Sequence, residues 1–202
     1  TGNMGVVLPE KGFLEMLREE TQRIGALLIF DEVITGFRVG LTGAQGLFGI
    51  DPDLSCFGKV IGGGFPVAAV GGKAKFLDEL APIGKVYQAG TLSGNPVAMR
   101  SGLETLQIIE KEGFYESLNQ KAMQIILPLQ KALENKNGCI QYCGSMFNIF
   151  FGVKKVNSKE DLSNLNERKF IEFFSYLFER GIYISPSSQE AWFLSGAHLD
   201  EE

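Results

Sequence analysis

The chain has 202 residues, of which 45% are hydrophobic and 21% are charged, a composition typical of a folded globular protein that excludes a mainly disordered chain. The formal net charge of −5, without a lysine or arginine cluster, argues against nucleic acid as the main partner. No apolar run reaches the roughly 20 residues that a membrane-spanning helix needs, so we expect no membrane partner.

The three cysteines and the two ends of the chain restrict its context. Cys56, Cys139 and Cys143 lack the second pair or histidine cluster of a zinc site, so we expect reduced, structural thiols and no bound metal. Without a signal-peptide pattern, we predict a cytoplasmic location, or a plastid if the source is a plant or alga with a transit peptide upstream. The start at Thr1 and the stop in an acidic "AHLDEE", typical of a first helical turn, indicate an internal piece of a longer protein.

The first residues alternate between helix and strand signals. The run after Pro9 predicts a helix with its apolar residues on one face and Gly25 at the position of its C-cap. The strand that follows, 26–30, is apolar on both faces. This pattern predicts an interior strand of a mostly parallel sheet covered by helices, and therefore an α/β fold.

A glycine-rich stretch, 36–49, leads to two short apolar segments on either side of the glycine turn 62–64. Asn95 followed by Pro96 predicts a helix that runs to about Lys111, because asparagine caps a helix start and proline suits the first turn.

The character of the chain changes after this helix. The patterns predict helices at 114–135 and 165–180, and strands at 146–153 and 181–185. We therefore expect two domains, 1–103 and 104–202, the second a smaller α/β lobe.

"LLIFDEV" places Asp31 directly after the buried strand. In an open α/β sheet, ligands bind at the carboxyl ends of the strands, so Asp31 is a site candidate. Capping of a loop or pairing with an arginine would also explain it. So would the Walker B motif of a magnesium ATPase, although G-x-x-x-x-G-K-[ST] is absent from these residues.

A second interpretation pairs Asp31 with Lys59. A carboxylate and a lysine at neighbouring strand ends, beside glycine-rich turns, are what a pyridoxal phosphate enzyme requires. The lysine amine forms a Schiff base with the cofactor aldehyde, and the aspartate keeps the pyridine nitrogen protonated through a charge-assisted hydrogen bond.

Three motifs, "LLIFDEVITGFRVG", "FGKVIGGGFPVAAVGG" and "YQAGTLSGNPVAM", together resemble the class III pyridoxal phosphate aminotransferases over the whole chain. The last two are more typical of the branch that moves an amino group within one substrate molecule. The resemblance implies fold type I of the pyridoxal phosphate-dependent transferases. Residues 1–103 would then form the C-terminal part of the large, mixed-sheet cofactor domain, and 104–202 an incomplete small α/β domain.

The resemblance also implies roles for individual residues. Lys59 becomes the Schiff-base lysine and the group that moves protons between substrate and cofactor. Asp31 becomes the partner of the pyridine nitrogen, and Val33 packs under the ring. Asn3 matches an asparagine near the phenolic oxygen of the cofactor.

Further residues match positions at the border of the site. Gly90 and Thr91 match a segment that reaches across a homodimer interface to the cofactor phosphate of the neighbouring subunit. Glu190 matches a glutamate that faces the substrate pocket, although Trp192 stands where a small residue is expected, so that either the pocket border differs or the indole points into the core.

The implied activity is an intramolecular amino transfer that converts (S)-4-amino-5-oxopentanoate to 5-aminolevulinate in tetrapyrrole synthesis, through the pyridoxamine phosphate form of the cofactor. An ω-aminotransferase that acts between an amine or amino acid and a keto acid would share Asp31 and Lys59 and stays an alternative. The second phosphate loop, the aromatic that stacks on the ring and the arginine for the substrate carboxylate precede these residues in the family.

Overall fold

The structure, a computed structural model, describes residues 1–198. The chain forms two compact units: 11–112, which we call the lysine unit, and 1–10 together with the chain from Gly113 onward, which we call the terminal unit. The helix predicted from "AHLDEE" falls mostly outside the described residues. Among the residues described, no helix is long and apolar enough to cross a membrane.

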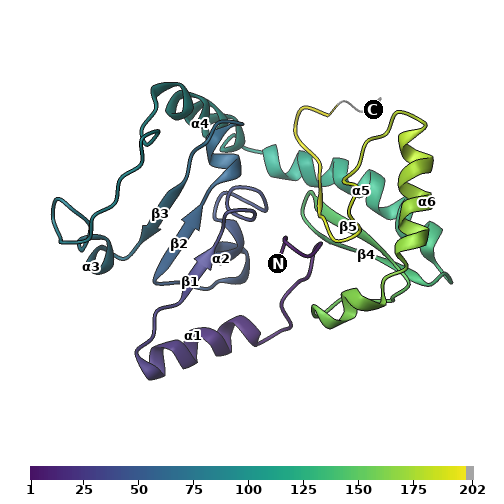
Figure 1. The fold of residues 1–202 in the computed structure, drawn as a ribbon, viewed down its shortest axis with the longest axis horizontal. Helices are drawn as coiled ribbons and strands as arrows, with labels where there is room; N and C mark the ends of the chain where they lie inside the picture. The colour runs from purple at the N-terminus through teal and green to yellow at the C-terminus, as the bar shows by residue number, and fades with distance from the viewer. Residues whose placement is uncertain (199–202) are drawn as a thin grey trace. The chain divides into compact units, whose positions relative to one another are not determined.

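The lysine unit contains a three-stranded mixed sheet in the order β1-β2-β3 (Figure 1). Strand β1 is parallel to β2, and β2 is antiparallel to β3. Its elements are α1 (Phe13–Ile24), β1 (Ile29–Asp31), α2 (Gly43–Phe48), β2 (Leu54–Phe57), the 3-10 turn η1 (Lys59–Gly62), β3 (Ala69–Gly72), α3 (Ala74–Leu77) and α4 (Pro96–Ile109).

Two helices of this unit confirm the expected start and stop signals. Helix α1 ends at Ile24 and is capped by Gly25, whose φ of 72° is the left-handed conformation that glycine adopts most easily. Helix α4 begins after Asn95, whose side chain accepts hydrogen bonds from the backbone N–H groups of Val97 and Ala98 at 3.1 and 3.2 Å.

Strand β1 differs from the prediction in length and in burial. It begins at Ile29, and it pairs with β2 alone among the described residues. The side chain of Ile29 is 55% exposed, although Leu28 is buried. Among the described residues β1 is therefore an edge strand with an exposed Ile29, and its burial on both faces stays a prediction for the complete protein.

A buried carboxylate joins the elements of the lysine unit. Asp53 accepts hydrogen bonds from the backbone N–H of Leu28 at 2.9 Å, from Arg18 at 3.0 Å and from Lys73 at 3.3 Å. Leu28 immediately precedes β1, Arg18 lies in α1, and Lys73 immediately follows β3. The hydrogen bond from Leu28, followed by those from Arg18 and Lys73, lowers the pKa of Asp53 from 3.8 to about 2.

We expect Asp53 to stabilise the folded state by an amount that changes with pH in the acid range. Because its pKa is lower in the folded chain, the contribution is complete above 3.8 and is lost as pH falls toward about 2. Asp53→Asn leaves Arg18 without its carboxylate partner and should lower the free energy of unfolding by about 3 kcal/mol near neutral pH. Urea unfolding of wild type and variant at several pH values measures this difference. A difference that stays constant between pH 4 and pH 2 would contradict the assignment.

The terminal unit contains an antiparallel sheet in the order β4-β5-β6. Helices α5 and α6 pack on one face, where Phe147, Ile149 and Phe151 meet residues of both helices. Phe150 faces the other way and packs with Val7. Its elements are α5 (Phe114–Leu133), β4 (Gly138–Cys143), β5 (Met146–Phe151), the 3-10 turn η2 (Glu160–Asn164), α6 (Glu167–Phe178) and β6 (Trp192–Phe193).

The strands of this unit differ in part from the prediction. The strand expected at 181–185 is absent, because Ile182 and Tyr183 are exposed and no neighbouring strand offers them hydrogen bonds in the described part of the chain. The third strand is β6, which pairs with β5. The indole of Trp192 contacts the rings of Phe147 and Phe173 at centroid distances of 5.5 and 6.2 Å, so the side chain points into the core.

The border between the units falls at Gly113, whereas the sequence analysis places a domain boundary at residue 104. Residue 104 lies inside α4, a continuous helix that packs on η1 of the lysine unit. The assignment of 1–103 to the C-terminal part of a large domain and of 104–202 to an incomplete small domain stays a prediction.

Candidate active site

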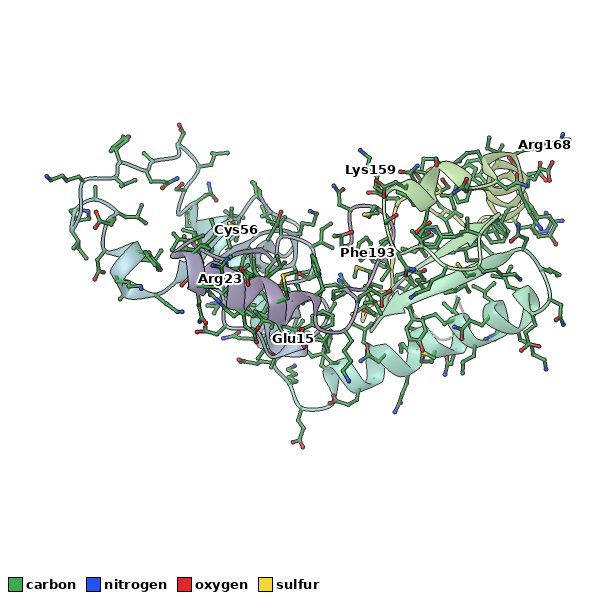
Figure 2. The ribbon with its side chains drawn as sticks, turned by 90° about the horizontal axis from the view of Figure 1, so that it is seen from below. Glu15, Arg23, Cys56, Lys159, Arg168 and Phe193 are labelled. Atoms are coloured by element: carbon green, nitrogen blue, oxygen red, sulfur yellow. The ribbon has the colours of Figure 1, made fainter. Side chains whose placement is uncertain are left out.

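The site candidates Asp31 and Lys59 lie at the same end of two adjacent parallel strands. Asp31 closes β1 and pairs with Cys56 of β2, labelled in Figure 2. The next residue, Glu32, donates its backbone N–H to the carbonyl of Cys56 at 2.9 Å. Strand β2 ends at Phe57, and Lys59 opens the turn η1 after Gly58. Lys59 therefore belongs to a helical turn just beyond the strand.

The turn that carries Lys59 is held by helix α4. Lys59 has a φ of 48°, a left-handed conformation that is unusual for a residue other than glycine. The hydroxyl of Ser101 donates to the carbonyl of Gly63 at 2.9 Å. A Cβ on Gly102 would lie 2.3 Å from the carbonyl oxygen of Ile61, so the helix backbone can approach η1 because residue 102 is glycine. These contacts fix the backbone from which the lysine side chain extends.

Val33 connects the aspartate to the lysine turn. Its backbone N–H donates to Asp31 Oδ1 at 3.0 Å. Its Cγ1 lies 3.3 Å from the position that a Cβ on Gly58 would take, so the side chain rests against the backbone that precedes Lys59. The side chains of Asp31 and Lys59 are both exposed, and within residues 1–198 neither forms an ion pair.

This arrangement fits pyridoxal phosphate. The carboxylate of Asp31 suits a protonated ring nitrogen, the amine of Lys59 suits an aldehyde, and the isopropyl group of Val33 suits a flat apolar ring. Gly58 leaves room for Val33 where a Cβ would crowd it. Within residues 1–198, no group of three or more histidine, cysteine, aspartate or glutamate side chains could hold a metal ion, and all three cysteines are free thiols.

Glu32 supports the site, although it is not among the residues predicted from the sequence. Its side chain is 0% exposed and accepts hydrogen bonds from the backbone N–H groups of Ala44 and Gln45 at 3.0 and 2.7 Å, and from the hydroxyl of Thr35. Gly43 has no Cβ to collide with this carboxylate, since one would lie 2.8 Å from its oxygens. Glu32 thus ties the loop after Asp31 to the start of α2. The signal in the sequence was a second carboxylate ahead of a glycine-rich run.

Gly90 and Thr91 lie in an exposed turn just before α4. The backbone N–H of Ser93 donates to the carbonyl of Gly90 at 2.9 Å, and a Cβ on Gly90 would lie 2.6 Å from Ser93 Oγ. The backbone and the threonine hydroxyl are therefore accessible to an anion such as a phosphate. The role of this turn toward a neighbouring subunit stays a prediction.

Asn3 and Glu190 belong to the terminal unit, and both side chains are exposed. Asn3 forms an isolated bridge with Gly5. Glu190 closes a turn in which its backbone N–H donates to the carbonyl of Ser187 at 3.3 Å. The roles of both side chains stay predictions.

Comparison with known proteins identifies the family of this chain. The model of the family described as "Aminotransferase class-III" matches residues 1–197. The chain belongs to the class-III aminotransferase family. The resemblance found in the three motifs is thereby confirmed at the level of the family.

Individual class-III relatives are similar over nearly the whole chain. The glutamate-1-semialdehyde 2,1-aminomutase of Protochlamydia amoebophila is 53% identical over 98% of this chain and 46% of its own length. The glutamate-1-semialdehyde aminomutase of Pseudomonas aeruginosa, solved in complex with PMP, is 27% identical with a TM-score of 0.86 over 98% of this chain and 46% of its own. The β-phenylalanine aminotransferase of Variovorax paradoxus is 30% identical, with a TM-score of 0.90, over 98% of this chain and 46% of its own.

The chain spans about half the length of the curated class-III relatives that it matches. The predicted α/β fold of the pyridoxal phosphate-dependent transaminases is confirmed by these matches.

Proposed function

We propose that the protein is a pyridoxal phosphate-dependent aminomutase that converts glutamate-1-semialdehyde to 5-aminolevulinate. This product is the first precursor committed to tetrapyrrole synthesis. The observation that carries this proposal is the identity of about half of all positions with proteins named for that reaction. Sequence identity is 53% with the Protochlamydia protein and 48% with that of Sulfolobus acidocaldarius. The placement of Asp31 and Lys59 at one sheet end supports the same chemistry.

The residues of this chain would have the following roles toward the cofactor and the substrate. Asp31 would accept a hydrogen bond from the protonated ring nitrogen, and Val33 would pack against the ring. The amine of Lys59 would react with the aldehyde. Asn3 would contact the phenolic oxygen, and Glu190 would face the substrate.

Pyridoxal phosphate supplies a carrier for the amino group and a ring that delocalises the electrons of a substrate carbanion. The residues of this chain would bind and orient the cofactor and the substrate, and would move protons between them. Lys59 Nζ, as a free amine, would move protons between the substrate carbon and the cofactor. Asp31 keeps the positive charge on the ring nitrogen, which strengthens electron withdrawal.

We also propose a homodimer in which the turn at Gly90 and Thr91 binds the cofactor phosphate of the neighbouring subunit. The turn is exposed, and among the described residues no hydrogen bond occupies the hydroxyl of Thr91. Both observations support this role.

We also propose a cytoplasmic location, with which the free cysteines are consistent.

A second function is favoured by one observation. The solved ω-transaminase of Sphaerobacter thermophilus is 31% identical over 96% of this chain, which is more than the 27% of the solved aminomutase. An aminotransferase would use Asp31 and Lys59 in the same way, and it would need a separate amino donor and acceptor.

One assay separates the two functions. We expect the full-length protein, loaded with pyridoxamine phosphate and given glutamate-1-semialdehyde without another amino donor or acceptor, to accumulate 5-aminolevulinate over many turnovers. The product is measured by its colour reaction after condensation to a pyrrole. Activity that appears only after an amino acid and a keto acid are added would replace the aminomutase by an aminotransferase.

A further inference from the structure

Asn148 is a buried amide in the middle of β5, with 0% of its surface exposed. Because side chains alternate along a strand, Asn148 lies on the same face as Phe150 and away from Ile149, which packs under the helices. Its Nδ2 donates to the carbonyl of Ser188 at 2.9 Å. Its Oδ1 accepts no hydrogen bond from the residues that the structure describes.

The first loop that meets Asn148 carries Asn3, and we call residues 1–7 the Asn3 loop. The backbone N–H of Val7 donates to the carbonyl of Thr1 at 3.0 Å, which closes the loop. Gly5 has a φ of 77°, and a Cβ there would lie 2.7 Å from Asn148 Nδ2. The backbone of the Asn3 loop therefore rests directly on the amide.

The neighbouring strand holds the same loop in place. Gln141 of β4 is the pairing partner of Asn148, so both side chains lie on one face of the sheet. Gln141 Nε2 donates to the carbonyl of Val6 at 2.7 Å and to that of Val156 at 3.0 Å, and its Oε1 accepts from the N–H of Val156 at 2.7 Å. Unlike Asn148, this amide has both of its polar atoms paired.

The second loop that meets Asn148 carries Glu190, and we call residues 185–191 the Glu190 loop. The carbonyl that Asn148 holds belongs to Ser188, which is buried. The hydroxyl of Ser188 donates to the carboxylate of Glu167 at the start of α6 at 2.6 Å. Glu190 follows in the same turn, because its N–H donates to the carbonyl of Ser187.

Packing alone does not explain an asparagine at this position. A buried carbonyl oxygen without a donor destabilises the folded state, whereas leucine, which has the same number of side-chain heavy atoms, would carry no unpaired polar atom. The amide does make one contact that leucine cannot make, the hydrogen bond to Ser188.

We propose that Asn148 is a positioning residue that holds the Asn3 loop and the Glu190 loop at a fixed distance from each other. This inference rests on the proposed function, in which Asn3 contacts the cofactor and Glu190 faces the substrate. One buried side chain then sets the spacing between a cofactor contact and a substrate contact without touching either molecule.

The test uses the full-length protein with Asn148→Leu, which keeps the number and branching of the side-chain heavy atoms and removes the hydrogen bond to Ser188. Asn148→Ser, which is too short to reach that carbonyl, serves if the leucine variant does not fold. Ile149→Ala is the matched control, because it weakens the same strand on the face away from both loops. Hydrogen exchange followed by mass spectrometry, without substrate, reports on each loop directly.

We expect amides of both loops to exchange at least about tenfold faster in the Asn148 variants and at the wild-type rate in Ile149→Ala. With substrate, kcat/KM should fall about 10- to 100-fold, mostly through KM. The visible absorption of the bound cofactor should shift in the same direction as in an Asn3→Ala variant measured alongside. Wild-type exchange in either loop of both Asn148 variants, or the same faster exchange in the Ile149 control, would overturn the proposal.

The exchange measurement separates this inference from the proposed function. If wild-type protein makes no 5-aminolevulinate while Asn148→Leu loosens both loops, the positioning role stands and the assigned reaction falls. If the protein makes 5-aminolevulinate while the loops of the Asn148 variants stay protected, the reaction stands and the positioning role falls.

Discussion

Replacing Lys59 by alanine is expected to lower kcat of the full-length protein by at least about 1,000-fold, because one side chain supplies both the covalent link and the proton transfer. The turn η1 should keep its backbone in the variant, since its contacts with α4 involve Ser101 and Gly102 rather than the lysine side chain. The thermal unfolding midpoint should therefore stay close to that of the wild type. Steady-state kinetics and a melting curve measure the two quantities on the same sample.

Lys11→Ala is the control for the Lys59 variant, because Lys11 is an exposed lysine of the same unit and lies outside the sheet end. It should keep normal turnover. Borohydride reduction of the loaded wild type, followed by peptide mass spectrometry, should place the cofactor on the peptide that contains Lys59. Near-normal turnover of Lys59→Ala, or a reduced adduct on another lysine, would show that the covalent role belongs elsewhere.

The position of Asp31 and Lys59 could be predicted because it depends on local pattern and on one general rule. An apolar run followed by a carboxylate marks the end of a strand, and parallel neighbours end at the same side of a sheet. The structure places Asp31 opposite Cys56, so a residue shortly after Cys56 has to emerge at the same end. The capping signals at Gly25 and Asn95 are equally local, and both helices begin or end where expected.

Other features depend on contacts between residues that are far apart in the sequence. The segment 181–185 has the composition of a strand, but a strand forms only where another strand offers hydrogen bonds, and β5 pairs with β6 instead. In the sequence, Glu32 is only a second acidic residue after a strand. Its burial depends on hydrogen bonds that its carboxylate accepts from the backbone N–H groups of Ala44 and Gln45. A single sequence does not reveal such partners.

Asp31→Asn isolates the charge of the aspartate from its shape. Asparagine keeps an oxygen that can accept from the Val33 N–H, a bond of 3.0 Å in the structure, so the loop after β1 should stay in place. The amide is neutral, and the cofactor ring nitrogen loses the partner that keeps it protonated. Removal of one preorganised electrostatic partner typically lowers kcat by about 100- to 1,000-fold, and we expect a loss in this range.

The measurement that checks the Asp31 variant combines kinetics with cofactor affinity. We expect the dissociation constant for pyridoxal phosphate to rise along with the loss of kcat, because the charge-assisted hydrogen bond contributes to binding as well as to carbanion stabilisation. Asp78→Asn, an exposed aspartate at the end of α3, should change neither quantity. Since Asp31 is exposed, its variant should unfold at the wild-type temperature, which separates a chemical defect from a folding defect. Wild-type turnover in Asp31→Asn would mean that the carboxylate only shapes the loop after β1, and the pairing of Asp31 with the ring nitrogen would have to be abandoned.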